Sequence, residues 1–249
     1  MRHCLPISLI VFVLACGGEG AGDAGVAPIT TQPTTGTPTN GSPTTGSPTY
    51  DVDANGIPKF AAASYIDLDQ IARISRFRSG VGHDYSDAFE SCRTMKHYFQ
   101  PRSNVQWGAV RIYAPVEGTI VFMRAEQSFG TQVGIRSTAQ PAFTFIVFHV
   151  NPVGVDSGAN VTAGQQLGTH IGTQTMSDVA VAVQTPTGFK LVSWFDVITD
   201  ELFATYAARG VSTRESVVIG RAERDGSRLA CNGETYVGGA TLESWVELK

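Results

Sequence analysis

The stretch SGVGHDYSD, residues 79–87, places His83 and Asp87 four residues apart behind two glycines. The chain has only five histidines, so each imidazole is a candidate for metal or proton chemistry. A catalytic zinc ion takes three protein ligands and keeps one position open for water. His83 and Asp87 could supply two of these ligands, and Gly80 and Gly82 would let the backbone fold tightly around them. Taken alone, the pair is also the pattern of an ordinary polar turn.

Three later stretches follow this pair in order: IYAPVEGTIVF (112–122), FTFIVFHV (143–150) and SGANVTAGQQLGTHIG (157–172). Together they resemble the lysostaphin-like M23 metallopeptidases (LytM-type domains), over about residues 80–185. In that family an HxxxD motif precedes an APxxGxV strand, a strand ending in His, a GxxVxxGQxIG segment and an HxH strand. The resemblance implies a mainly β fold, a compact antiparallel sheet of the M23 or duplicated hybrid motif type with a few peripheral helices. It also implies a zinc groove that acts on the peptide cross-bridges of peptidoglycan.

The resemblance also implies roles for individual residues. His83 and Asp87 fall on the first two zinc ligands, and His149 falls on the non-ligand histidine that polarises the substrate or stabilises the oxyanion. Asp178 replaces the catalytic-base histidine of the HxH strand, and Ala180 replaces the third zinc ligand. Because residues i and i+2 of a strand face the same way, both would face the groove. Ala180 has nothing to offer a metal.

Other residues could compensate for this loss. Asp178 could bind the metal itself, but it would then be unavailable as a base, and a carboxylate-rich set favours harder ions than zinc. His170 lies just before the altered strand and could turn in, and His97 lies in the segment CRTMKHYF. We expect both to be hydrogen-bonded structural histidines.

Two classes of function follow. The first is a non-catalytic M23 peptidase-like domain that binds a cell-wall peptide or a cell-wall hydrolase, and some family members that have lost their ligands do activate cell-wall amidases. The second is an active zinc metalloendopeptidase in which His83, Asp87 and Asp178 hold the metal while His149 or His170 acts on the substrate. A structural surface lipoprotein without a ligand is a third class. We expect the first, a pseudo-peptidase, with zinc bound through a partial site if at all.

The N-terminus predicts export. A positive start, the apolar run LPISLIVFVLA and small residues before Cys16 make a secretory signal, and the run is too short to span a bilayer. The break before Cys16 resembles the lipobox of bacterial lipoproteins, which predicts lipidation of Cys16 and a membrane-anchored protein in the periplasm or on the cell surface. Secretion with a free Cys16 is the alternative. Residues 17–50 are rich in Thr, Pro and Gly and predict a disordered tether.

Residues 51–249 suffice for one domain. The pattern predicts a short helix over 66–77, a helix near 194–209, a hairpin around Asp225-Gly226 and a closing strand at SWVELK. Short β-branched and aromatic runs between turn residues predict strands; these are 109–114, 117–124, 131–137, 142–150, 166–171, 178–184 and 189–194.

The number of cysteines predicts a disulfide, and the net charge excludes one class of partner. With Cys4 in the signal and Cys16 lipidated, Cys92 and Cys231 are left as an even pair in an oxidising compartment, which predicts a disulfide between them. A metal-binding or reactive thiol is the alternative, although neither cysteine has CxxC spacing. The net charge of −4 predicts no nucleic-acid partner.

Overall fold

The structure, a computed structural model, describes residues 48–172 and 175–249. In this part of the chain the fold is mainly β, with an 11-stranded antiparallel sheet, a separate two-stranded hairpin and short helices. The fold class that the sequence predicts is therefore confirmed. Cys16, the signal segment and the tether up to residue 47 lie outside the described residues.

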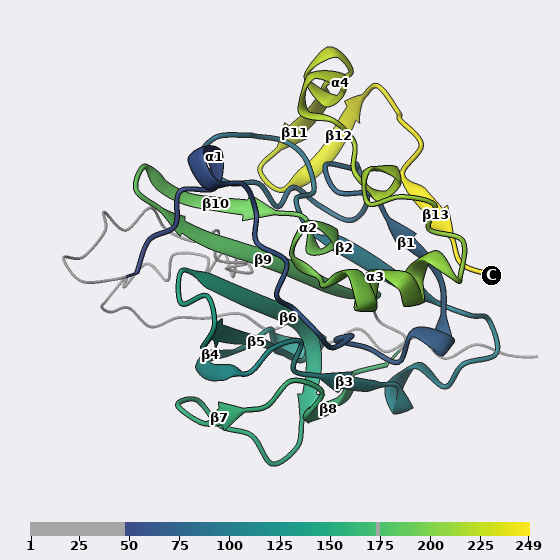
Figure 1. Cartoon of the computed structure of the whole chain (residues 1–249). Helices are drawn as coiled ribbons and strands as arrows, with labels where there is room; N and C mark the ends of the chain where they lie inside the picture. The colour runs from purple at the N-terminus through teal and green to yellow at the C-terminus, as the bar shows by residue number, and fades with distance from the viewer. Residues whose placement is uncertain (1–47, 173–174) are drawn as a thin grey trace, which may run out of the picture. The chain divides into compact units, whose positions relative to one another are not determined.

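The strands are β1 Ile71–Ser75, β2 His97–Pro101, β3 Arg111–Tyr113, β4 Gly118–Ala125, β5 Thr131–Ser137, β6 Phe143–Pro152, β7 Asn160–Val161, β8 Gln166–His170, β9 Ser177–Thr185, β10 Gly188–Val192, β11 Leu229–Asn232, β12 Thr235–Gly239 and β13 Trp245–Glu247. The predicted runs between 109 and 194 correspond to β3, β4, β5, β6, β8, β9 and β10, whereas the sequence predicts no strand at β1, β2 or β7. The sheet order is β13-β1-β2-β9-β6-β5-β4-β7, with β10 paired to β9, and with β8 joining β6 to β3 (Figure 1).

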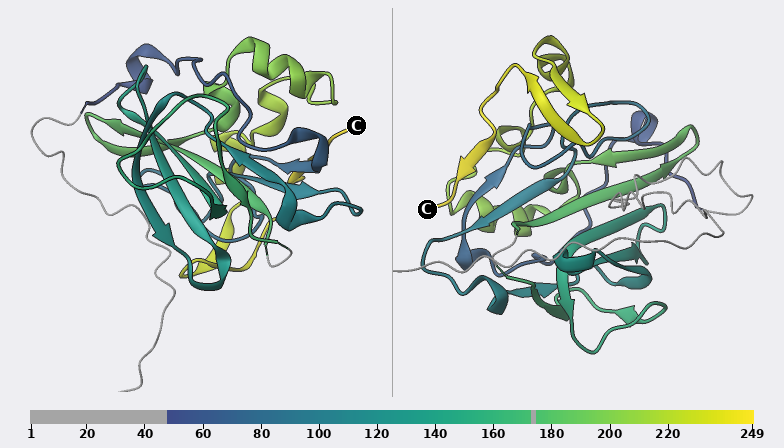
Figure 2. Two further views of the ribbon diagram at one scale, coloured as in Figure 1. Left: turned by 90° about the horizontal axis from the view of Figure 1, so that it is seen from below. Right: turned by 180° about the vertical axis from the view of Figure 1, so that it is seen from behind.

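Four α-helices accompany the strands. They are α1 Val52–Asn55, α2 Trp194–Val197, α3 Asp200–Ala207 and α4 Arg221–Gly226. Figure 1 shows α2 and α3 against one face of the sheet, next to β9 and β2. Figure 2 shows α4 with the hairpin β11–β12 at the opposite end of the fold from β7. No helix in the described part of the chain is long and apolar enough to cross a membrane.

Strand β9 is buried on both faces, and its alternation separates two apolar clusters. Val179, Val181 and Val183 belong to the main core, which also contains residues of α2 and α3. Ala180 and Ala182 point the other way. They belong to a smaller cluster, called here the site-face cluster; its buried members are Phe77, Met95, Ile146, Phe148, Ala180, Ala182 and Leu191. Because Asp178 is two residues before Ala180, it shares this second face.

The predicted helix over 66–77 is wrong. Its centre is the strand β1, which pairs antiparallel with β2 on one side and β13 on the other. Ile71 and Ile74 are both fully buried, and their spacing of three had suggested one face of a helix. Pairing with two distant strands satisfies the backbone of this short segment, and a tertiary context of this kind overrides a weak helical pattern.

The C-terminal part differs from its prediction in two places. The helix predicted near 194–209 is two helices, because Ile198 is extended and Thr199 caps α3 through its side chain. The hairpin predicted around Asp225-Gly226 is displaced: these residues end α4, and the hairpin turn lies between β11 and β12 at Gly233, which has φ 58°. The closing strand is present as β13.

The disulfide is observed as predicted. Cys92 and Cys231 are joined across 139 residues of sequence. Cys92 lies in the loop before β2 and Cys231 lies in β11, so the bond ties the C-terminal hairpin to the loop that follows the glycine-rich stretch.

Gly82 carries a mutational prediction. Its φ is +74°, and a Cβ added there would lie 2.2 Å from Tyr98 Oη. We expect Gly82→Ala to lower the free energy of unfolding by roughly 1–3 kcal/mol through overpacking, in addition to the backbone strain. Gly56→Ala is the matched control, because Gly56 has φ +72° with nothing within 4 Å of an added Cβ. Equal costs in urea unfolding of the two variants would contradict the prediction.

Candidate functional site

A buried lysine lies at the centre of the residues that the sequence singles out. Lys96 is 2% exposed and forms an ion pair with Asp178, whose carboxylate is fully buried. Its Nζ also lies 3.3 Å from His83 Nε2. Three aromatic rings enclose the ammonium at 4.2 to 4.9 Å from their centroids; they belong to Tyr85, Tyr98 and Phe148. The structure thus brings His83 and Asp178 to the same cation.

The register explains why Lys96 reaches this place. Strands β2 and β9 pair with His97 opposite Val179 and Tyr98 opposite Asp178. Continuing the same register by one residue places Lys96 opposite Ala180. The small side chain of Ala180 leaves the space that the long side chain of Lys96 fills. The lysine therefore lies beside Ala180, on the face of β9 that also carries Asp178.

His149 contacts the other oxygen of Asp178. Its Nε2 lies 3.1 Å from Asp178 Oδ1, and its Nδ1 is 2.9 Å from the Phe129 carbonyl and 3.2 Å from Glu126 Oε2. Burial lowers the pKa of His149, but the two carboxylates outweigh burial and raise that pKa to about 10. The ring is therefore an imidazolium at neutral pH, with both N–H groups directed at oxygen atoms.

The backbone of His149 has a strained conformation, which directs its ring toward Asp178. Its φ is 59°, in the left-handed region that non-glycine residues rarely occupy. At this point β6 changes partner, from β9 at Val147 to β8 at Val150. The change of partner turns the imidazole out of the ladder and toward Asp178. Strain of this kind persists where surrounding contacts hold it.

Asp178 is held by charge on both sides. Lys96 and His149 lie within ion-pair distance of its two oxygens, but neither contact has the angles of a hydrogen bond. Burial raises the pKa of Asp178, but the Lys96 and His149 charges outweigh it and lower that pKa to about 2. An isolated buried carboxylate would be strongly unfavourable, so the two cations are what keep it ionised.

His83 accepts from Lys96 and does not carry a proton there. Its Nδ1 lies 2.9 Å from the Asp84 carbonyl, which can only accept, so Nδ1 holds the hydrogen and Nε2 is the free lone pair. Burial and the charge of Lys96 lower the pKa of His83. The lone pair that a metal would use is therefore directed at the ammonium.

Asp87 has a different use from the one the family resemblance implies. Its Oδ1 accepts from the backbone N–H groups of Phe89 and Glu90, and its Oδ2 accepts from the N–H of Leu191. The carboxylate therefore shapes the turn that follows the glycine-rich stretch and fastens it to β10. Both of its oxygens therefore already accept hydrogen bonds from backbone N–H groups.

Zinc does not fit these residues. The described ranges contain no group of three or more His, Cys, Asp or Glu side chains that could hold a metal. An ammonium stands between His83 and Asp178, and a cation there repels a second cation. Neutral His83, Asp87 on backbone N–H groups and Ala180 leave no open three-ligand set of the kind a catalytic zinc requires.

The other two histidines of residues 48–172 and 175–249 occupy separate positions. The His170 ring lies against Trp107 with ring centroids 4.2 Å apart and the planes tilted by 33°, and its centroid is 6.2 Å from that of His149. Its Nδ1 accepts from the Gly172 N–H, and its buried Nε2 has no hydrogen-bond partner among the described residues. His97 lies on the opposite face of β2 from Lys96, and bonds the Ser75 carbonyl and Ser193 Oγ. His97 is thus a structural histidine, as expected.

His97 makes stability depend on pH. Burial outweighs the bond to the Ser75 carbonyl and lowers the pKa of His97 from 6.5 to about 4. Between these values the unfolded chain binds a proton that the folded chain does not bind, so acid favours unfolding. We expect the free energy of unfolding to fall, by roughly 3 kcal/mol from this residue, as the pH decreases from 6.5 to about 4. Urea unfolding across this range measures it.

His97→Gln is the control for this pH dependence. Glutamine can donate and accept hydrogen bonds but does not titrate, so the variant should lose the part of the slope that His97 supplies. His170 has a pKa lowered to about 4, mainly by burial, and keeps its own contribution in the variant. An unchanged slope in His97→Gln would contradict the assignment.

Sequence reasoning missed Lys96 and Glu126. Lys96 stands in TMKHYF, where a charged residue interrupts an otherwise buried segment. That interruption was the available signal, because a lysine is almost never fully buried without a partner. Glu126 has no comparable signal, since it lies in the exposed-looking turn between β4 and β5.

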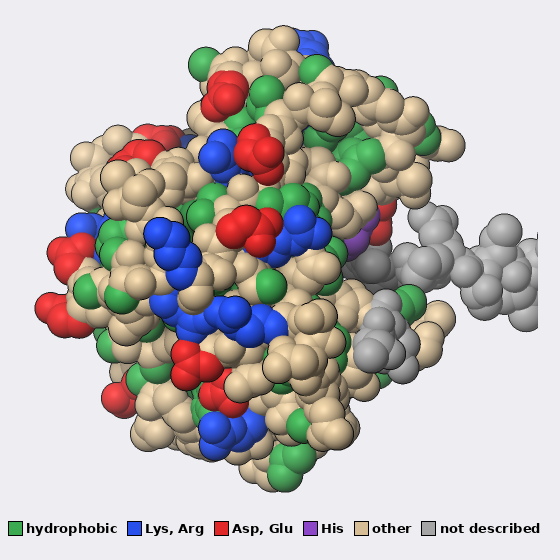
Figure 3. All heavy atoms as spheres, turned by 90° about the vertical axis from the view of Figure 1, so that its right-hand side faces the viewer, with side chains coloured by type: hydrophobic (Ala, Val, Ile, Leu, Met, Phe, Trp, Pro, Cys, Tyr) green, Lys and Arg blue, Asp and Glu red, His purple; other side chains and the backbone are tan. Residues whose placement is uncertain are grey.

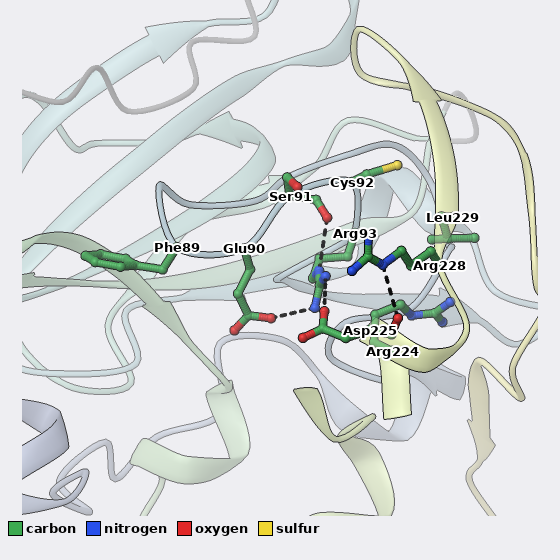
Figure 4. Close-up of a pocket in the computed structure, with 9 residues that line it drawn as sticks. All are labelled: Phe89, Glu90, Ser91, Cys92, Arg93, Arg224, Asp225, Arg228 and Leu229. Carbon is green, nitrogen blue, oxygen red and sulfur yellow. Dashed lines mark hydrogen bonds and ion pairs between the residues drawn. The ribbon is translucent and has the colours of Figure 1, made fainter. Parts of the chain in front are cut away.

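A pocket of about 340 Å³ opens beside the disulfide (Figure 4). The loop 89–93, the end of α4 and the start of β11 line it. Arg93 is nearly buried and binds Glu90 at 2.8 Å and Asp225 at 2.7 Å. Arg228 also lines the pocket and is exposed. The opening therefore presents both signs of charge beside an apolar edge.

Charges of both signs also alternate elsewhere on the surface. Figure 3 shows basic and acidic side chains next to one another on the face beside α3. Ion pairs near α3 include Arg209–Asp69 and Arg111–Asp67, each with one more exposed partner. A broad field of positive charge is typical of a nucleic-acid-binding surface, and the face shown does not have one.

No protein-family model matches the sequence, and no curated protein matches it. Among solved structures, the chain is similar to Csd3 of Helicobacter pylori, with 16% identity and a TM-score of 0.42 over 62% of this chain and 40% of that one. It is similar to the catalytic domain of the antimicrobial peptidase lysostaphin from Staphylococcus simulans, with 17% identity and a TM-score of 0.33 over 47% of this chain and 83% of that one. A zinc-containing peptidase from Vibrio cholerae has 14% identity and a TM-score of 0.32 over 55% of this chain and 38% of that one.

The chain thus spans less than half of the length of Csd3 and of the Vibrio cholerae peptidase. At identities of 14% to 17%, these likenesses concern the fold alone.

Proposed function

We propose that this chain is an exported lipoprotein whose M23 peptidase-like domain is non-catalytic and binds cell-wall peptide or a cell-wall hydrolase. The observation that carries the proposal is Lys96, whose ammonium stands between His83 and Asp178. Asp178 could act as a base only by taking up a proton, and the charges of Lys96 and His149 lower its pKa to about 2. A metal-bound water and a base to deprotonate it are the two requirements for M23-type chemistry.

The burial of the charged side chains around Asp178 supports a binding role and not a catalytic one. Lys96, Asp178 and His149 are buried or nearly so, and His83 is the most exposed of the group with 32% of its side chain accessible. A peptide bond cannot reach a carboxylate that no solvent reaches. Binding therefore belongs to the surface, and the pocket beside Arg93 and Arg228 offers ionic partners for a peptide that carries both carboxylate and ammonium groups.

The test is cosedimentation of the purified chain with peptidoglycan sacculi, with and without added zinc. We expect the chain to be retained in the pellet and to release no soluble fragments under either condition. Arg228→Glu should weaken the retention, because it reverses the exposed charge at the pocket. Arg124→Glu is the matched control, since Arg124 is an exposed arginine on β4 outside this pocket.

Each outcome discriminates between the classes of function. Zinc-dependent release of fragments would establish the alternative, an active metalloendopeptidase with altered ligands. Absence of retention would refute peptidoglycan binding. Stimulation of a cell-wall amidase by the chain would then identify the hydrolase as the partner, and its absence would leave a structural lipoprotein.

A further inference from the structure

We propose that Lys96 Nζ and Asp178 Cγ become joined by an intramolecular isopeptide bond, which the folded chain forms itself with loss of one water. The inference goes beyond the proposed binding role and uses the same two side chains: the amide would keep Lys96 between His83 and Asp178 and would remove the carboxylate that could act as a base. It rests on a buried amine held against a buried carboxylate, with an imidazolium on the other side of that carboxylate.

The fold holds the two reacting groups together permanently. Lys96 precedes β2 and Asp178 lies in β9, and these adjacent strands fix the pair through their backbone register. Both side chains are nearly or fully buried, at 2% and 0% exposure, so neither can turn to water. Groups held in such a geometry react with effective molarities of about 10⁵–10⁸ M. Proximity therefore compensates for the low reactivity of a carboxyl group toward an amine.

The surroundings favour the amide over the ion pair. Tyr85, Tyr98 and Phe148 surround the ammonium, and Phe148 also belongs to the site-face cluster. Two charges buried in such a place carry a large desolvation penalty, which a neutral amide does not carry. The water that forms leaves an apolar site for bulk solvent. Both effects drive the condensation forward.

His149 is placed as the acid for this reaction. Its Nε2 lies 3.1 Å from Asp178 Oδ1, the oxygen that Lys96 does not pair with. The Phe129 carbonyl and Glu126 hold the ring from its Nδ1 side. An imidazolium at this oxygen stabilises the negative charge that develops there when the carbonyl is attacked. His149 is thus a catalytic residue of the condensation.

The steps balance without a cofactor. Lys96 passes one proton to Asp178 Oδ2, leaving a neutral amine and a carboxylic acid. The amine lone pair forms the Nζ–Cγ bond, while the Cγ–Oδ1 π electrons move to Oδ1 and take the Nε2 proton of His149. The nitrogen gives a second proton to Oδ2, the Cγ–Oδ2 bond breaks, and Oδ2 leaves as water. The Cγ–Oδ1 double bond re-forms and its proton returns to His149.

The control for this proposal lies within the same molecule. Lys190 forms an ion pair with Asp53, but Asp53 is 75% exposed and forms no ion pair with a histidine of the described residues. This second lysine–aspartate pair has proximity without burial. It should remain an ordinary ion pair under the conditions in which Lys96 and Asp178 are linked.

The experiment is mass spectrometry of the purified chain after reduction and denaturation. We expect the peptides that contain Lys96 and Asp178 to be recovered as one branched species, lighter than their sum by one water. An amine-reactive reagent applied after unfolding should label Lys190 and leave Lys96 unlabelled. His149→Ala should slow the appearance of the branched species at least tenfold, and Lys96→Met should abolish it.

The unmodified chain decides the outcome even where a variant fails to fold. Separate peptides at their full masses, with Lys96 labelled as well as Lys190, would overturn the proposal. Loss of a water mapped to any other residues would overturn it equally. A branched species whose fraction increases with time after folding would establish both the bond and its formation by the folded chain.

Discussion

Replacing Lys96 by methionine is expected to lower the free energy of unfolding by about 3–5 kcal/mol, the cost of removing one partner from a buried ion pair. Methionine keeps much of the length of the side chain among Tyr85, Tyr98 and Phe148, so the loss is mainly one of charge. The carboxylate of Asp178 would remain fully buried, and among the described residues only His149 would still form an ion pair with it. The same change removes the amine that the proposed cross-link requires. Urea unfolding of the variant and the unaltered chain measures the effect.

Two further variants separate charge from packing. Lys96→Met combined with Asp178→Leu should recover the part of the lost stability that comes from the unpaired buried carboxylate, because replacing a buried ion pair by apolar residues of similar volume is often neutral. Lys190→Met removes the lysine of the more exposed pair with Asp53 and should cost about 1 kcal/mol or less. A Lys96→Met variant as stable as Lys190→Met would show that Asp178 does not depend on its ammonium.

Removing the disulfide is expected to cost about 2–5 kcal/mol, the range for native bonds in exported domains. The bond between Cys92 and Cys231 spans 139 residues, and closing a long loop restricts the unfolded chain strongly. The double variant Cys92→Ala/Cys231→Ala avoids free thiols. Its midpoint of urea unfolding should fall with little change in the native fold, since neither cysteine belongs to the 11-stranded sheet.

The hairpin β11–β12 should be the first part to loosen in that variant. Outside the disulfide, Tyr236 bonds Thr94 Oγ1 at 2.7 Å and the His83 carbonyl at 3.0 Å. Hydrogen exchange should therefore accelerate in β11 and β12 before it does in β9. Uniform acceleration across the sheet would contradict a local role. Reduction of the unaltered chain should reproduce the variant.

Strand positions could be predicted because period and turn chemistry are local properties. Runs such as 131–137 and 142–150 alternate or fill with β-branched and aromatic residues between turns, and they form β5 and β6 almost residue for residue. The segment 66–77 could not be assigned the same way. Ile71 and Ile74 fit a helical face as well as a strand, and pairing with β13, more than 160 residues later, decides between them.

The sequence by itself determined the β architecture and the Cys92–Cys231 bond, because these depend on residue type and local order. Only the tertiary structure decided which partners Lys96, Asp178 and Asp87 have. Lys96 meets Asp178 across the β2–β9 ladder, at a separation in sequence that no local pattern reaches. Backbone N–H groups from two segments donate hydrogen bonds to the carboxylate of Asp87. A side chain's partner is set by long-range register and by burial, and both arise when the sheet assembles.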